Sequence, residues 1–241
     1  MDEPEKRETA LIDRSVMKRT EQIFPEEMRL ILASTNLMRR ITGVSKNATK
    51  EFSTDPVLPA LMNLFARNRE LVHFSTVCLL NGGYASAKVL ARVGLENSLY
   101  MRLFRKKPEL AKNWFSNPET FRIEWTQKKI REELFSKTPT LWKAYKEFYW
   151  VLCNYSHPSF KGWSEHIVGD SILWHPVLNV DYASECIGLI FFILIQSFQQ
   201  FAHAFKQWIP DRMIAEINSL LTKDSQMVRR HFVVIKNGKI I

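Results

Sequence analysis

Residues 186–195 form the most apolar run of the chain, and Gln196 ends it. Asp181 precedes this run as a helix N-cap, and the helical pattern continues to about Trp208. A helix that is apolar on all its faces belongs at the centre of a bundle, where other helices cover it. The run is also shorter than the roughly 20 residues that a membrane-spanning helix needs. We therefore predict a buried central helix and no membrane insertion.

The remaining segments also show helical periodicity, interrupted by short breaks. The clearest break is Asn81-Gly82-Gly83, a helix C-cap followed by a tight turn, between long helical segments over residues 55–80 and 86–104. Two long helices joined by so short a break form an antiparallel hairpin. We therefore predict an all-α helical bundle. Further helices are expected over residues 8–23, 25–43, 107–115, 117–135, 138–155 and 210–221.

Two short segments have the signature of a β-hairpin. One lies near residues 166–174, around Gly169-Asp170, and the other near residues 232–241, around Asn237-Gly238. A polar, aperiodic stretch before Asp55 separates the first helices from the rest. The predicted domains are an N-terminal helical extension over 1–50, a helical bundle over 51–225 and a C-terminal β-hairpin tail over 226–241.

The cysteines and the first residues indicate a cytoplasmic location. The three cysteines are scattered and form no Cys-x-x-Cys pair, so neither a disulfide framework nor structural zinc is expected. Cysteines without such pairing suit a reducing compartment. The sequence begins with charged residues and without the apolar core of a signal peptide.

Basic residues are concentrated in the middle of the chain. The net charge is +9, and residues 101–150 alone carry twelve basic and six acidic side chains. A basic surface of this kind attracts the phosphates of RNA or nucleotides. An excess of lysine and arginine is also typical of a solvated helix face, so the charge by itself leaves both interpretations open.

Polar side chains suited to chemistry occur at few positions. The chain has no glycine-rich phosphate loop, no His-Glu-x-x-His and no Gly-x-Ser-x-Gly, and we predict no cofactor and no metal. Asn154 and His157 stand at the end of an apolar helix, where the helix dipole favours a protonated imidazole. Arg92 and Glu96 share one face of another apolar helix. A helix cap and a structural ion pair would explain the same residues without any chemistry.

Three weaker patterns remain. Arg67-Asn68-Arg69, followed by His73, has the residue order of a short ribonuclease signature, but residues six apart on a helix point to different faces. Cys153 precedes His157 by one turn and could form a nucleophilic pair with it, although a core cysteine is the simpler interpretation. His166 and His175 lack the spacing of a known metal site.

Several segments taken together resemble a known superfamily. They are Phe65 to Leu80, the break at residues 81–84, Ala85 to Glu96, and Asn154 to Pro158. The set resembles a group of uncharacterised bacterial all-helical proteins. Their pattern is a leucine-rich helix, a glycine turn, a Leu-x-Arg-x-x-x-Glu helix and a later Ser-His at a helix end. These proteins are similar to the HEPN superfamily of four- to five-helix bundles.

The resemblance implies a HEPN-like bundle that forms a homodimer and has a polar cleft. Active members are metal-independent ribonucleases, many of them in defence systems, and inactive members bind nucleotides or RNA or serve as scaffolds. The arginine that precedes the family's histidine has no counterpart here, because residues 150–152 are Trp, Val and Leu. Arg92 is expected to supply that positive charge from the neighbouring helix. On this mapping one site is lined by Arg92, Glu96, Asn154 and His157.

We therefore expect a HEPN-like cytoplasmic bacterial protein that binds or cleaves RNA or nucleotides in defence or stress. In cleavage His157 is the acid or base, and Arg92 stabilises the charge of the phosphorane. Asn154 positions the phosphate and Glu96 holds Arg92. The alternatives are a non-catalytic interaction module, in which these residues form a buried polar network, and a small-molecule sensor built on the aromatic residues 142–150. A site that is open to solvent favours binding or cleavage of RNA or nucleotides, and a site sealed in the core favours the non-catalytic interaction module.

Overall fold

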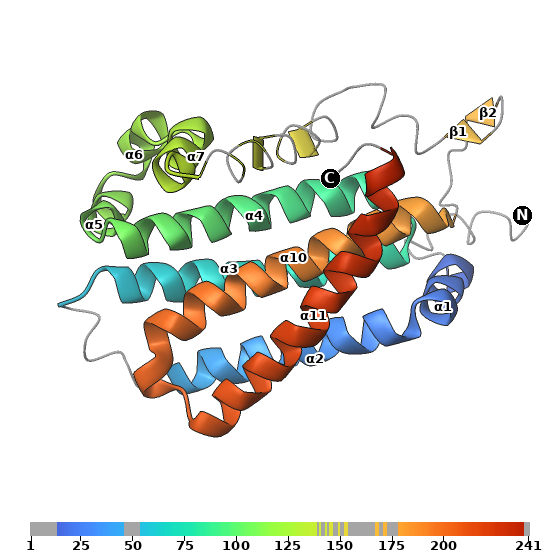
Figure 1. The fold of residues 1–241 in the computed structure, drawn as a ribbon, viewed down its shortest axis with the longest axis horizontal. Helices are drawn as coiled ribbons and strands as arrows, with labels where there is room; N and C mark the ends of the chain where they lie inside the picture. The colour runs from blue at the N-terminus through green and yellow to red at the C-terminus, as the bar shows by residue number, and fades with distance from the viewer. Residues whose placement is uncertain are drawn as a thin grey trace, which may run out of the picture.

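The computed structural model describes three long stretches of the chain, residues 14–45, 54–138 and 178–238. It also describes the separate residues 140, 143, 145, 146, 149, 152, 153, 167, 168, 171 and 172. The described chain is almost entirely helical, which confirms the all-α prediction (Figure 1). The helices are α1 (Arg14–Ile23), α2 (Pro25–Ser45), α3 (Val57–Leu80), α4 (Tyr84–Lys106), α5 (Glu109–Ser116), α6 (Pro118–Glu124), α7 (Gln127–Phe135), α10 (Val180–Phe205), the 3-10 helix η2 (Lys206–Trp208) and α11 (Asp211–Gly238).

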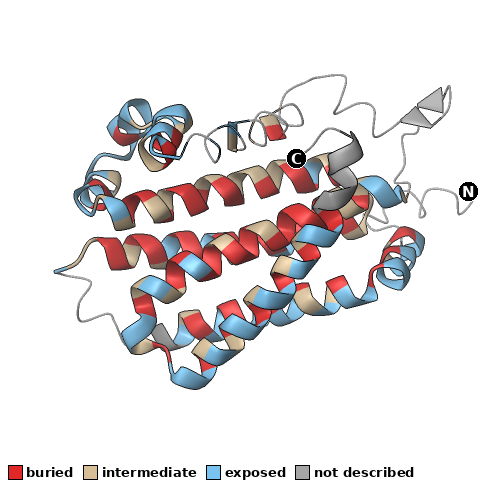
Figure 2. Cartoon of the chain, viewed as in Figure 1, coloured by how far each residue is buried: buried red, intermediate tan, exposed pale blue. Residues whose placement is uncertain are grey.

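The apolar helix α10 is the centre of the bundle, as its sequence predicts. It packs against α2, α3, α4 and α11, and Figure 1 shows it surrounded by these helices. Within the run 186–195 only Phe192 is not fully buried, and the band of buried residues follows α10 in Figure 2. Burying one such apolar side chain stabilises the fold by about 1.5–3 kcal/mol, so the covering of α10 is a principal source of stability.

The helices α3 and α4 form the predicted antiparallel hairpin. The connection is short because Gly82 adopts a φ of 72°, a left-handed conformation that costs other residues about 1–2 kcal/mol. The N–H of Gly83 then donates to the Cys78 carbonyl at 2.8 Å, which satisfies a carbonyl at the end of α3.

A buried polar network joins this hairpin to α10. The amide of Asn68, on α3, donates to the hydroxyls of Ser98 and Ser197 at 3.1 and 2.9 Å. Asn97 donates to the Asn68 carbonyl oxygen at 2.9 Å. Because buried amides are costly unless they are hydrogen-bonded, these contacts favour one register of the three helices.

The helices α2 and α11 pack antiparallel along a seam of polar contacts. Successive contacts lie about two turns apart on each helix, so a single register satisfies all of them. The same seam encloses apolar side chains, and Leu37, Met38 and Ile41 of α2 are fully buried. Helix α2 therefore shares the core of the bundle. The polar pairs include Glu27–His231 at 3.2 Å, Ser34–Asp224 at 3.4 Å and Arg40–Glu216 at 2.8 Å, and Arg230 also pairs with Glu26 at 3.4 Å.

The prediction of a hairpin at residues 232–241 is wrong as far as residue 238. The helix α11, expected to end near residue 221, continues from Asp211 to Gly238. Extending an existing helix costs little per residue, whereas an isolated two-stranded hairpin is marginal in water. The seam with α2 extends α11 as far as His231, and the β-branched residues after it follow that helix. Residues 239–241 lie outside the described part of the chain.

One expected helix is divided into two in the structure, and two short strands lie in a segment predicted as a hairpin. The helix expected over residues 117–135 is interrupted at Trp125, and Thr126 begins α7 by accepting a hydrogen bond from the Lys129 N–H. Within the segment predicted as a hairpin, β1 (Ile167–Val168) and β2 (Ser171–Ile172) pair antiparallel. The turn residues 169 and 170 lie outside the described residues.

The central helix also passes a simple test for a membrane span. Residues 180–208 are long and apolar enough to cross a bilayer by length and composition, but 72% of the most apolar window is buried inside the protein. Such burial is typical of the core helix of a soluble bundle.

Asp224 provides a test of the α2–α11 seam. This carboxyl is fully buried, and burial raises its pKa from 3.8 to about 7. The folded state therefore binds the proton more tightly than the unfolded state, and the carboxyl makes the protein less stable as the pH rises from about 4 to 7. We expect Asp224→Asn, which can still accept from Ser34, to be more stable than the wild type at pH 8 by about 2–4 kcal/mol.

The measurement is urea denaturation of both proteins between pH 4 and pH 8. The difference in stability should shrink towards pH 4, where the wild-type carboxyl is protonated in the folded state. His231, seven residues further along α11, titrates in both proteins, so its contribution cancels. A stability difference that does not change with pH would show that Asp224 is ionised in the fold.

Candidate polar site on helix α4

Arg92 and Glu96 meet on the exposed side of α4, and Tyr149 joins them. The Arg92 Nε lies 3.0 Å from Glu96 Oε1, and Arg92 Nη2 donates to the Tyr149 hydroxyl at 3.2 Å. The same hydroxyl donates to Glu96 Oε1 at 2.7 Å. The three groups close a triangle that fixes the Arg92 guanidinium on α4. The four-residue spacing of Arg92 and Glu96 produces this ion pair, as the sequence predicts.

The electrostatics of the triangle keep Arg92 charged and Tyr149 neutral. Burial first, and then the hydrogen bond and charge of Glu96, raise the pKa of Tyr149 to about 12. Burial lowers the pKa of Arg92, but the neighbouring Tyr149 and Glu96 outweigh it, and the net shift is upward. The Tyr149 hydroxyl therefore remains a hydrogen-bond donor to the carboxylate at physiological pH.

A second arginine, Arg131 of α7, lies against the same tyrosine. Its guanidinium carbon is 4.0 Å from the centre of the Tyr149 ring, and that of Arg92 is 5.2 Å away. Such cation–π contacts stabilise a partly desolvated arginine. Arg131 is 7% exposed, and in the described part of the chain its Nε and Nη1 have no hydrogen-bond partner. The cluster thus contains two guanidinium groups and one carboxylate.

The structure describes two of the four residues of the predicted site. Arg92 and Glu96 come together as predicted, and their side chains are 23% and 20% exposed, so solvent reaches them. Asn154 and His157 lie outside the described residues. Cys153, which is described, lies near Arg92.

A basic pocket lies further along α4, where α4 meets α7 and α10. Arg105 donates to Gln200 Oε1 at 2.7 Å. Burial and the charge of Arg102 both lower the pKa of Arg105, so the two arginines crowd each other. Within the described residues no carboxylate pairs with either of them. The pocket is lined by Arg102, Arg105, Lys106, Leu134, Gln199 and Gln200.

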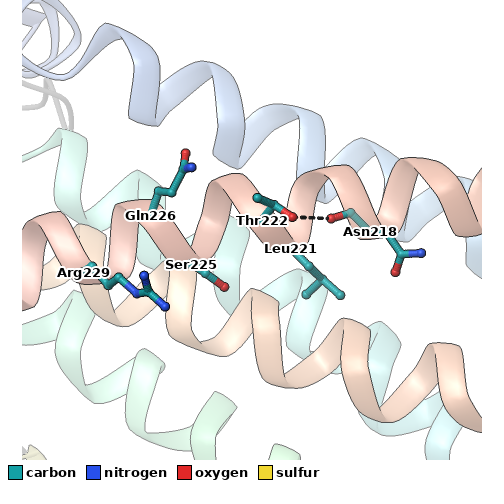
Figure 3. A pocket seen from close by; sticks show the side chains of 6 residues that line it. All are labelled: Asn218, Leu221, Thr222, Ser225, Gln226 and Arg229. Carbon is teal, nitrogen blue, oxygen red and sulfur yellow. Dashed lines mark hydrogen bonds between the residues drawn. The ribbon is translucent and has the colours of Figure 1, made fainter.

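A shallow pocket on α11 offers less chemistry. Figure 3 shows its six lining side chains along one helix, with the Thr222 hydroxyl bonded to the Asn218 carbonyl at 3.0 Å. A hydroxyl that returns to its own backbone is unavailable to a ligand. Arg229 is the one charged side chain among the lining residues. We assign no role to this pocket.

Sequence analysis missed a hydroxyl–imidazole–carboxylate chain between three helices. Ser184 lies 2.7 Å from His231 Nδ1, and His231 Nε2 lies 3.2 Å from Glu27 Oε1. Burial lowers the pKa of His231, although the charge of Glu27 opposes this, so the neutral ring accepts from Ser184 and donates to Glu27. This is the connectivity of a nucleophilic triad, but His231 and Glu27 are 4% and 3% exposed. We interpret it as a link between α2, α10 and α11.

The weaker sequence patterns do not converge on one site. Asn68 is buried in the network of α3, α4 and α10, whereas Arg67 and His73 are exposed on the surface of α3. His166 and His175 lie outside the described residues. Among the residues that the structure does describe, no three histidine, cysteine or acidic side chains lie together as a metal site.

Tyr149 and Arg131 are the site residues that sequence reasoning missed. Tyr149 precedes Cys153 by four residues and so shares its helix face, which was a usable signal. Arg131 was one of twelve basic residues in the segment 101–150, and nothing in its local sequence marks it as buried.

No family model, curated protein or solved structure matches the chain.

Two substitutions at Tyr149 test this cluster. Tyr149→Phe removes the hydroxyl but keeps the ring, and we expect it to lower the free energy of unfolding by about 1 kcal/mol. Tyr149→Leu also removes the surface against which both arginines lie, and the loss should be larger by about 0.5–2 kcal/mol. Urea denaturation measures both values. Equal stabilities for the two variants would show that the arginines do not depend on the ring.

Proposed function

We propose that the protein is a HEPN-like cytoplasmic bacterial protein that binds RNA or nucleotides without a metal and can cleave RNA. The observation that carries this proposal is the basic pocket, in which Arg102 and Arg105 lie side by side and no carboxylate of the described residues pairs with them. Crowded guanidinium groups are stabilised by an anion, and arginine is well suited to the phosphates of nucleic acid. The pocket falls in the basic segment 101–150, the predicted source of nucleic-acid binding.

The polar cluster at Arg92 supports the catalytic part of the proposal. Arg92 is charged, anchored by Glu96 and reached by solvent, as a group that stabilises developing negative charge should be. In the proposed reaction His157 is the acid or base that transfers the proton of the attacking or leaving oxygen. Asn154 positions the phosphate. A homodimer and a role in defence or stress are further parts of this proposal.

The closed triangle of Arg92, Glu96 and Tyr149 favours a second candidate, a non-catalytic interaction module. Each of the three side chains forms a hydrogen bond with the other two. The triangle therefore holds Tyr149 against α4. Such a network needs no ligand to be stable. Partial solvent exposure of Arg92 favours the first candidate, and RNA experiments distinguish the two.

RNA binding is tested with two double variants of equal charge. Arg102→Gln/Arg105→Gln removes the pocket cations, and Lys112→Gln/Lys128→Gln removes two exposed cations of the same segment. We expect the first pair to bind labelled single-stranded RNA at least about tenfold more weakly than the wild type, since two phosphate contacts are lost. The control should bind nearly as the wild type does. Equal weakening in both would mean that only overall charge matters.

RNA cleavage is tested with the wild type and His157→Ala. Both are incubated with labelled total tRNA and a generic single-stranded RNA in EDTA. We expect cleavage by the wild type only, with a loss of about 100-fold or more in rate for the variant. Tyr149→Phe, which keeps Arg92 paired to Glu96, should retain most of the activity. A folded wild type that binds RNA but cleaves none of these substrates would favour the interaction module.

A further inference from the structure

We propose that Arg131, together with Arg92, forms a binding site for a terminal phosphate group where α4 and α7 meet Tyr149. The inference rests on the proposed function for the source of that phosphate, a nucleotide or an RNA end. It adds Arg131, which belongs to neither the Arg92–His157 set nor the basic pocket.

Arg131 buries hydrogen-bond donors that it does not use. Arg131 is only 7% exposed, and its Nε and Nη1 have no hydrogen-bond partner among the residues that the structure describes. Arginine is almost never buried without a partner, because an unpaired charged donor forfeits its hydration. Within the described residues no carboxylate forms an ion pair with Arg131. An acceptor with negative charge is therefore the group that this position requires.

The Tyr149 ring orients the guanidinium group of Arg131. The Tyr149 ring covers Arg131 at 4.0 Å from its guanidinium carbon. A guanidinium that lies flat on a ring keeps its N–H groups in its own plane, where they stay available to an acceptor. Because the ring is held by its hydroxyl bond to Glu96 at 2.7 Å, the donors of Arg131 are oriented before any ligand arrives, and little conformational entropy is lost on binding.

The local charge of the cluster is positive. Arg92 and Arg131 both lie against the Tyr149 ring, and Glu96 neutralises one of them. One positive charge remains in a partly desolvated place, where electrostatic attraction to an anion is stronger than in water. A phosphate group offers several acceptor oxygens to donors on different edges of the guanidinium.

Access to the cluster selects the kind of phosphate. The side chains of Arg92 and Glu96 are 23% and 20% exposed, so the cluster opens to solvent on the Arg92 side, and Arg131 lies deeper. A terminal phosphate can reach a recessed arginine, whereas the internal phosphodiesters of a polymer are held back by the flanking nucleotides. We therefore infer a preference for phosphate monoesters, such as a mononucleotide or the 5′-phosphate end of an RNA.

The test uses the full chain and three variants of α7. Arg131→Met keeps the length of the side chain and removes its donors, and Arg131→Lys keeps the charge without the planar fork. Lys128→Met is the matched control, because Lys128 lies on the same helix with a 77% exposed side chain. Thermal unfolding is followed in Hepes at constant ionic strength, with sodium phosphate replacing sodium chloride. Calorimetric titrations use 5′-AMP and adenosine.

We expect phosphate at about five times its Kd to raise the Tm of the wild type and of Lys128→Met by about 2–4 °C. Arg131→Met should show no such rise, and Arg131→Lys should bind 5′-AMP at least about tenfold more weakly. Adenosine should not bind. Without phosphate, Arg131→Met should be at least as stable as the wild type, because it no longer buries unpaired donors.

Two results would overturn the inference. One is a phosphate effect of the same size in the wild type and Arg131→Met. The other is an absent effect in the wild type combined with destabilisation of Arg131→Met, which would make Arg131 a structural residue. Loss of RNA binding in the pocket variants does not bear on this result. Arg131-dependent binding of 5′-AMP by a protein that binds no RNA would reject the RNA function and keep this site.

Discussion

An α-helix without a polar face can be stable in water only if other helices cover it on every side. Helix α10 imposes this condition on the chain, and α2, α3, α4 and α11 fulfil it. The polar contacts between these helices then select one arrangement among those that would bury the same apolar area. The Asn68 network fixes α3 and α4 on α10, and the seam from Glu27 to Arg40 fixes α2 on α11.

The same condition divides helix α4 into a core face and a polar outer face. A Cβ on Gly94 would lie 3.1 Å from Ile193 of α10, so the two helices approach closely there. Arg92 and Glu96 lie two residues to either side of Gly94, about 200° around the helix, and therefore point away from α10. The polar cluster, with Arg131 and Tyr149, is held on the outer side of a helix whose inner side cannot move.

Sequence reasoning was accurate where a segment's own pattern decides its structure. The periodicity of α3 and α4, the Asn81-Gly82-Gly83 break and the ion pair of Arg92 with Glu96 are local properties, and the structure confirms them. It was wrong at residues 232–238, where Asn237-Gly238 and its β-branched neighbours indicate a hairpin. Helix α11, which packs on α2 as far as His231, continues through that segment, because extending an existing helix costs little per residue.

The sequence by itself determined that the chain is an all-helical bundle with a buried central helix, because apolar periodicity is a property of each segment. Only the tertiary structure decided which polar residues meet. Arg92 and Arg131 both lie against the Tyr149 ring, and His231 lies beside Glu27, although long stretches of sequence separate these residues. Their burial and unused hydrogen bonds depend on how helices pack side by side. Residue types and short spacings do not contain that information, so the anion site at Arg131 became visible only in the folded protein.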